Sequence, residues 1–278
     1  MTLASAVKGT LNTGSAVTLQ ANTDVTISDP VTANNPSGNG GNLTVQAGRS
    51  VPVNADITTD NGNLTLTAND TVANGVVDAQ RDAGNGVLTM AAGTSLNVGS
   101  GTLTVTLRNS LDKTYNARGV ATLQNVTAAS TVLNDGTVFA NSTITGPVTV
   151  NTGAVLGGTG TVTGSVTVAS GGTLAAGDSS LGTLTLALSP TLGGTTAMRI
   201  NKSGATLSRD RLVVNSGLTY GGTLTVTASS DPLTAGDTFD LFDPTSFSGS
   251  FGTTHLLVSA ACRAPGRSAW IWPTASIS

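Results

Sequence analysis

The chain has 278 residues, of which 10% are charged and 3% aromatic, and its formal net charge is -3. Its twelve Lys and Arg are scattered without a basic stripe, which argues against a nucleic-acid-binding surface. All acidic residues are Asp, and Gly, Thr, Val and Asn are abundant, so the composition favours strands and turns over helices. Because 38% of the residues are hydrophobic and they fall in alternating runs, we predict a folded all-β protein.

Export signals and disulfides are not evident in the sequence. The single cysteine, Cys262, excludes an intramolecular disulfide. Residues 1–8 lack a basic region followed by an apolar one, and no run approaches the ~18 apolar residues of a membrane span. We therefore expect no membrane-spanning segment, and if the protein is secreted, its signal peptide is not in this chain.

The N-terminal segment, residues 1–33, already alternates apolar and polar side chains. The alternation is clear in residues 16–19 and 24–27, before Asp29 and Pro30 interrupt the strand. We expect the repeating structure to be under way from the start, without a distinct cap.

A short phrase, in which glycine precedes alternating apolar residues and threonines, recurs along the chain. It is found at residues 41–45, 62–66, 86–90, 101–105, 146–150, 164–168, 182–186 and 222–226. The alternation places apolar side chains on one face of a strand and hydroxyls on the other, and the intervening glycines suit tight corners. Strands and corners that repeat about every twenty residues predict a solenoid.

We therefore predict a single right-handed parallel β-helix of about 12 to 14 coils, followed by an irregular C-terminal tail. Its interior should contain the apolar residues of the later phrases, stacked coil on coil. These are Val148, Val150, Val166, Val168, Leu184, Leu186, Leu224 and Val226.

The last part of the chain departs from the repeat. Phe239, Phe242, Phe247 and Phe251 arrive close together, and we expect them to fill or cover the final coils. Residues 259–278 hold both tryptophans and could form a cap or be a segment foreign to the native protein. Because this tail has two prolines and no alternation, we favour the second interpretation and expect its deletion to change the unfolding midpoint little.

Two parts of the sequence resemble known repeat families. Residues 62–107 resemble the repeats of filamentous-haemagglutinin-type exoproteins of two-partner secretion. Residues 131–252 resemble the autotransporter-associated β-strand repeat, notably at 164–186, 210–214 (DRLVV) and 235–242 (AGDTFDLF). We accordingly divide the chain into haemagglutinin-like repeats (1–130), autotransporter-associated-type repeats (131–258) in one continuous solenoid, and the tail (259–278).

Both resemblances imply right-handed parallel β-helices on, or released from, Gram-negative cells, chiefly as adhesins. They imply a non-catalytic stalk segment that is secreted or surface-displayed. Its expected partners are an outer-membrane β-barrel transporter and a host-cell or matrix ligand that the sequence does not identify. Two alternatives stay open, a β-helical carbohydrate-active enzyme (a polysaccharide lyase or hydrolase) and an ice-binding solenoid.

Few residues could carry out chemistry. His255 and Cys262 are each the only residue of their type, and the sequence offers neither a group that would orient a Cys–His nucleophile pair nor further zinc ligands. Asp178 follows Gly177 but lacks the glycine-rich nonapeptide of calcium-binding β-helices. We therefore predict no catalytic, cofactor or metal site.

The richest polar cluster comprises Asp70, Asp78, Arg81 and Asp82. Paired carboxylates can act as general acid and base in polysaccharide cleavage, which is the enzymatic alternative. We interpret the cluster instead as a loop of solvated Asn and Asp side chains in turn positions.

The phrase also repeats threonine at every second position, as in Thr102 and Thr104. Such a pattern could present a regular hydroxyl array, as ice-binding solenoids do. Outward threonine is equally the default for a strand whose other face is buried. Because the irregular spacing of the phrases would break a flat array, we interpret these threonines as structural.

Overall fold

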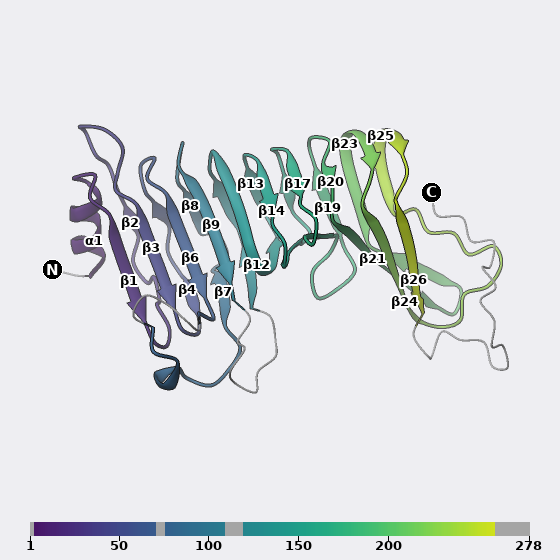
Figure 1. The fold of residues 1–278 in the computed structure, drawn as a ribbon, viewed down its shortest axis with the longest axis horizontal. Coiled ribbons are helices and arrows are strands. Elements are labelled where there is room, and N and C mark those ends of the chain that lie inside the picture. Colours follow the sequence, from purple (N-terminus) through teal and green to yellow (C-terminus); the bar gives the residue numbers. More distant parts are fainter. Residues whose placement is uncertain (1–2, 71–75, 109–118, 259–278) are drawn as a thin grey trace.

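The computed structural model describes residues 3–70, 76–108 and 119–258. Over these residues the chain winds into an elongated stack of coils, with α1 at one end and β24–β26 near the other (Figure 1). Three strand segments recur in each turn of the stack and form sheets that we name A, B and C. This arrangement confirms the prediction of an all-β parallel β-helix.

The elements are assigned as follows. Sheet A contains β1 (Val17–Ala21), β3 (Leu43–Ala47), β6 (Leu64–Ala68), β9 (Thr102–Leu107), the first part of β12 (Ser130–Ala140), β14 (Val148–Val150), β17 (Val166–Val168) and β20 (Thr191–Leu192). Sheet B contains β4 (Val51–Val53), β7 (Val87–Met90), β10 (Val120–Leu123), the second part of β12, β15 (Ala154–Gly157), β18 (Thr173–Ala175), β21 (Thr195–Ser203), β22 (Thr206–Arg209), β24 (Thr223–Ser230) and β26 (Thr253–Val258). Sheet C contains β2 (Val31–Thr32), β5 (Ile57–Thr58), β8 (Ser95–Asn97), β11 (Asn125–Thr127), β13 (Thr143–Thr145), β16 (Thr161–Val162), β19 (Thr183–Leu186), β23 (Arg211–Tyr220) and β25 (Phe242–Gly249).

Strands pair in parallel within each sheet, except that β22 runs antiparallel to β21 as a hairpin. β12 turns from sheet A into sheet B near Asp135, where the register shifts. It pairs with β9 on one side and with β14 and β15 on the other, so the stack continues without interruption past residue 130.

The core consists of the inward side chains of all three sheets, and each of the eight predicted interior residues is at most 3% exposed. Val148 stacks on Val166, as predicted. The expectation of a single stack is wrong for the later residues. Leu184 lies in sheet C beside Leu212, and Leu224 lies in sheet B beside Thr196.

The number of coils is smaller than predicted. Within the described residues, sheet C has nine strands, one for each coil, instead of about 12 to 14. The repeated phrase marks strands of every sheet, because residues 62–66 include β6 of sheet A, residues 86–90 include β7 of sheet B, and residues 182–186 include β19 of sheet C. The spacing of about twenty residues between phrases therefore underestimated the length of a coil, because some successive phrases lie in the same coil.

The N-terminus has a distinct cap, contrary to the prediction. Helix α1 (Leu3–Leu11) lies against β1 and β2. Val7 and Leu11, one helical turn apart and hence on one face of the helix, are 4% and 0% exposed. Gly14, at φ 76°, follows the helix and donates from its backbone N–H to the carbonyl of Leu11. The apolar face of α1 thus covers the interior of the first coil.

Aromatic residues pack near the other end, as expected for three of the four phenylalanines, Phe239, Phe242 and Phe251. Phe239 and Phe242 are 2% and 6% exposed. The ring of Tyr220 lies 5.4 Å from that of Phe242 and 4.9 Å from that of Phe251. Phe247 is 74% exposed and covers nothing in the core. The tail, with its cysteine and tryptophans, lies outside the described residues.

Candidate functional site

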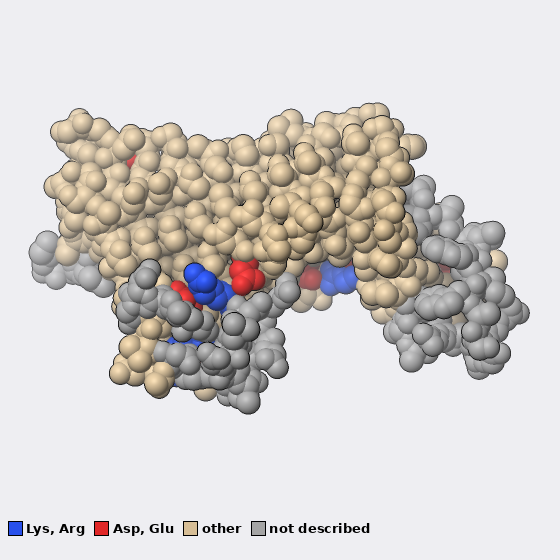
Figure 2. Space-filling model, viewed as in Figure 1, with Lys and Arg blue, Asp and Glu red and all other residues tan. Residues whose placement is uncertain are grey.

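In the earlier coils most charged side chains lie at corners and loops, whereas in the later coils the strands β21, β22, β23 and β25 also carry them. Figure 2 shows a solenoid body almost free of charge on the side viewed, with Lys, Arg and Asp side chains gathered along its lower edge. Among the described residues two carboxylates, those of Asp70 and Asp210, are completely buried. They mark the two places where charge enters the body of the protein.

Asp70 ends a hydrogen-bonded row that crosses several coils. Gln20 Nε2 donates to Gln46 Oε1 at 2.9 Å, and Gln46 Nε2 donates to Asp70 Oδ2 at 2.5 Å. From a later coil, Arg108 Nε lies 3.2 Å from Asp70 Oδ1. Both carboxylate oxygens are therefore occupied, and the row ties the last residues of β1 and β3 to the corners that follow β6 and β9.

Arg81 folds back over this corner and is only 7% exposed. Its Nη1 donates to Asn69 Oδ1 at 3.2 Å and to the carbonyl of Asp70 at 3.3 Å. The interpretation of the cluster as a solvated loop is consequently wrong for Asp70 and Arg81. The partners of Asp70 come from distant parts of the sequence, so only the stacking of coils brings them together.

The other members of the predicted cluster lie apart. Asp82 is exposed, with Oδ2 3.5 Å from Arg49 Nη2. The same Arg49 forms a closer pair with Asp24, at 2.7 Å, and this hydrogen bond lowers the pKa of Asp24. Asp78 begins the short 3-10 helix η1 (Asp78–Gln80), and its side chain lies outside the described residues. Among the described residues, Asp82 thus pairs with Arg49, whereas Asp70 contacts Gln46, Arg81 and Arg108.

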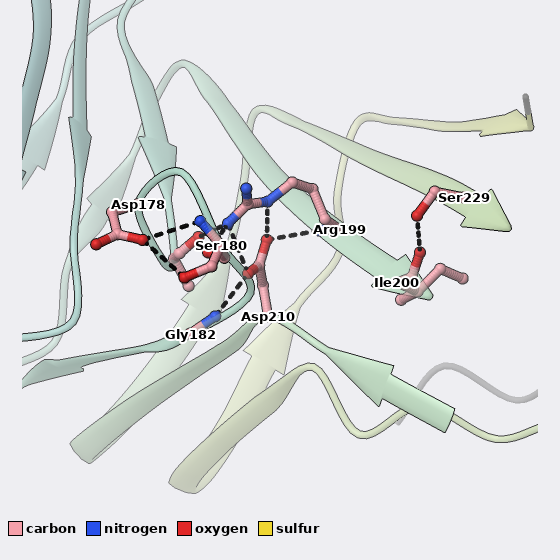
Figure 3. A network of polar contacts seen from close by, with 8 residues as sticks. Asp178, Ser180, Gly182, Arg199, Ile200, Asp210 and Ser229 are labelled. Atoms are coloured by element: carbon pink, nitrogen blue, oxygen red, sulfur yellow. Dashed lines mark hydrogen bonds and ion pairs between the residues drawn. The ribbon is translucent and has the colours of Figure 1, made fainter. Parts of the chain in front are cut away.

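Asp210 is held by Arg199 in a second corner, shown in Figure 3. Arg199 Nε and Nη2 lie 2.7 and 3.0 Å from Asp210 Oδ2 and Oδ1. The backbone N–H groups of Arg199 and Gly182 donate to the same carboxylate at 2.8 and 3.0 Å. The guanidinium also donates to the carbonyl of Ser180. Asp210 thus joins β21 to the loop before β19.

That loop contains the residues considered for calcium binding. Gly177 has φ 76° and pairs with Gly158 of the preceding coil. Asp178 Oδ1 accepts from the N–H and the hydroxyl of Ser180 at 2.9 and 3.0 Å, and the N–H donation lowers the pKa of Asp178. These bonds close an Asx turn. No group of three or more His, Cys, Asp or Glu residues suited to a metal occurs in the described parts of the chain.

A third cluster lies toward the C-terminal coils. Lys202 Nζ contacts both oxygens of Asp237, at 2.8 and 3.1 Å, and this bond lowers the pKa of Asp237. Arg211 lies within 3.3 Å of Asp240 and 3.0 Å of Asp243. These ion pairs also connect successive coils.

His255 and Cys262, which were considered as a nucleophile pair, cannot be compared in position. His255 stands exposed on β26 beside Thr225. Cys262 lies outside the described residues, so the structure does not place it relative to His255.

The fold defines the chain as a parallel β-helical repeat protein whose buried charges fasten its corners. Comparison with protein-family models, with characterised proteins and with solved structures finds no match to this chain. Over the described residues, no helix is both long enough and apolar enough to cross a membrane.

Proposed function

We propose that this chain is a non-catalytic structural and adhesive stalk segment of a secreted or surface-displayed exoprotein of a Gram-negative bacterium. One observation carries the proposal. Both oxygens of each buried carboxylate are engaged, those of Asp70 by Gln46 and Arg108 of other coils, and those of Asp210 by Arg199 and by Gly182 of the preceding coil. A carboxylate engaged in this way fastens the backbone and is poorly placed to exchange a proton with a substrate.

The solenoid architecture supports a stalk. Each coil contacts chiefly its neighbours, so a chain that emerges from a pore can add coils one after another. The resemblance to haemagglutinin-type and autotransporter-associated repeats supports the same assignment. We propose an outer-membrane β-barrel transporter as the export partner and a host-cell or matrix component as the ligand.

Adhesion is tested with beads coated with the folded chain. The beads are incubated with a panel of host cells and immobilised matrix proteins, and retention is compared with that of beads carrying heat-unfolded chain. We expect retention on at least one surface by the folded chain alone. Equal retention of both kinds of bead on every surface would contradict the adhesive proposal.

The enzymatic alternative is tested separately with a panel of polysaccharides, by measuring new reducing ends and unsaturated products. The proposal expects no turnover. Turnover that is lost in Asp78→Asn or Asp82→Asn, with an unchanged circular dichroism spectrum, would replace the stalk assignment with that of a carbohydrate-active enzyme.

A further inference from the structure

A row of threonines runs along the outer face of sheet A. Each member is paired in register with the next, from the first coil of the sheet to the last. In order, the members are Thr18, Thr44, Thr65, Thr104, Val132, Thr149, Thr167 and Thr191. We name this set the threonine row. Seven of its eight members are threonine, and the exception, Val132, keeps the β-branched shape.

The irregular spacing of the sequence does not break this row. The step from Thr65 to Thr104 crosses about twice as much chain as the step from Thr149 to Thr167. Each of these steps nevertheless advances by one strand, because the additional residues lie between the strands. The irregular spacing of the phrases therefore does not break the register of these threonines.

The surroundings of the threonine row carry little charge, although the register shift in β12 places Asp135 beside Thr106. The positions two before and two after each member carry no Lys, Arg or Asp and no aromatic residue. They are Ala16, Gln20, Asn42, Gln46, Asn63, Thr67, Thr102, Thr106, Ser130, Asn134, Pro147, Asn151, Ser165, Ala169, Ser189 and Gly193. Strands of sheet A cross the front of Figure 1, and the same side of the body in Figure 2 is nearly free of charge.

The seven hydroxyls of the row are also free of protein partners. No described residue of the chain forms a hydrogen bond with any of them, and none of the seven side chains is classed as buried. Since χ1 of threonine is restricted, each strand presents its methyl and hydroxyl in a defined position. Adjacent strands repeat every ~4.8 Å, so the row is a one-dimensional array of β-branched side chains with a regular step, and seven of its eight members carry a hydroxyl.

We propose that the outer face of sheet A binds ice, with the threonine row as its contact surface. A charged ligand would need opposite charges, which the row lacks. A sugar chain would gain little stacking on a face without aromatic rings. Ordered water needs neither charges nor aromatic rings. Fixed hydroxyls can join the hydrogen-bonded lattice of ice, and the methyl groups can occupy the gaps between its water molecules. The other sheets are less suited, since β23 of sheet C carries Arg211 and β21 of sheet B carries Arg199 and Lys202.

The experiment compares ice growth in solutions of the purified chain and of two matched double variants. Thr149→Lys with Thr167→Lys places two long charged side chains at neighbouring positions of the threonine row. Thr127→Lys with Thr145→Lys makes the same change at neighbouring exposed positions of sheet C. Thermal hysteresis and inhibition of ice recrystallisation are measured, and circular dichroism with thermal unfolding verifies that each variant is folded.

We expect the wild-type chain and the sheet C variant to inhibit recrystallisation equally, and the sheet A variant to lose the effect. Absence of both effects in the folded wild-type chain would overturn the proposal, as would an equal loss in the two variants. Binding to crystalline cellulose or chitin that is lost only in the sheet A variant, without any effect on ice, would identify a polysaccharide surface instead. The proposal does not depend on the adhesive function, and either can fail alone.

Discussion

Arg199 donates two parallel hydrogen bonds to Asp210, from Nε to Oδ2 at 2.7 Å and from Nη2 to Oδ1 at 3.0 Å. The Asp210 side chain is 1% exposed, while that of Arg199 is 36% exposed. Asp210→Asn replaces one carboxylate oxygen by an NH2 group, which cannot accept a hydrogen bond. Because Arg199 retains access to water, we expect a loss of about 2 to 3 kcal/mol in the free energy of unfolding.

Asp243→Asn is the matched control for that substitution. It removes a carboxylate that pairs with Arg211 at 3.0 Å but is 50% exposed, and it should cost less than about 1 kcal/mol. Urea unfolding of both variants measures the difference. Equal losses would show that burial of Asp210 does not govern its contribution.

Gly177 adopts φ 76° in the same corner, and a Cβ there would come within 2.7 Å of Asp210 Oδ1 and 2.6 Å of the Ser180 carbonyl. Gly236 has φ 96° with no atom near its would-be Cβ. Gly236→Ala should therefore cost only the strain of the left-handed conformation, about 1 kcal/mol, and Gly177→Ala at least about twice as much. Thermal unfolding of the two variants tests this, and similar midpoints would refute it.

Val168 points into the core at 1% exposure, while its neighbour Thr167 is exposed. Val168→Asp should cost more than about 3 kcal/mol, because the carboxylate has no partner among the apolar side chains of the interior. Thr167→Asp should cost little. Hydrogen exchange should accelerate first at β14, β17 and β20 in the core variant, and uniform acceleration along the whole solenoid would contradict the additive behaviour expected of repeats.

Leu11 is completely buried on α1. Leu11→Ala should destabilise the protein by about 2 to 4 kcal/mol, whereas Lys8→Ala, at an exposed position of the same helix, should be nearly neutral. Chemical denaturation followed by far-ultraviolet circular dichroism compares the two. If Leu11→Ala left the free energy of unfolding unchanged, α1 would not stabilise the first coil.

Asp24 and Asp237 have pKa values lowered by Arg49 and Lys202 respectively. A carboxylate with a lowered pKa in the folded state contributes stability that is complete above its unfolded pKa, about 3.9, and is lost as pH falls through the folded value. We expect nearly constant stability from these pairs between about pH 7 and pH 5, and a decline below about pH 4. Asp24→Asn with Asp237→Asn should flatten this decline in acid-unfolding curves, and an unchanged slope would exclude the two pairs as its cause.

The alternation of side chains was sufficient to predict which residues face the core. Val166 and Val168 are inward and Thr167 outward because a strand has a period of two, which is a local property. The sheet to which each strand belongs was not predictable in this way, since residues 62–66 and 86–90 have the same pattern but pair in sheets A and B. That choice depends on the lengths of the corners.

The candidate sites depended even more on distant residues. Burial of Asp70 requires Gln46 and Arg108, which belong to other coils, and its own neighbours in sequence are typical of an exposed turn. The threonine row could not be predicted from the sequence for the same reason. The register of its members becomes evident only when the paired strands are seen in the structure. Helix α1 was missed because its single short run of helical spacing precedes a long alternating sequence.

The unequal lengths of the coils affect how the sequence of such a chain can change. Leu64 lies beside Leu103 in sheet A just as Val148 lies beside Val166, although about twice as much chain separates the first pair. The stack thus accommodates extra length at a corner without altering the pairing on either side. Segments could be exchanged or grafted at such a corner while the scaffold is inherited intact, provided that buried contacts such as those of Asp70 and Arg81 are kept, so diversity at the corners and preservation of the scaffold need not compete.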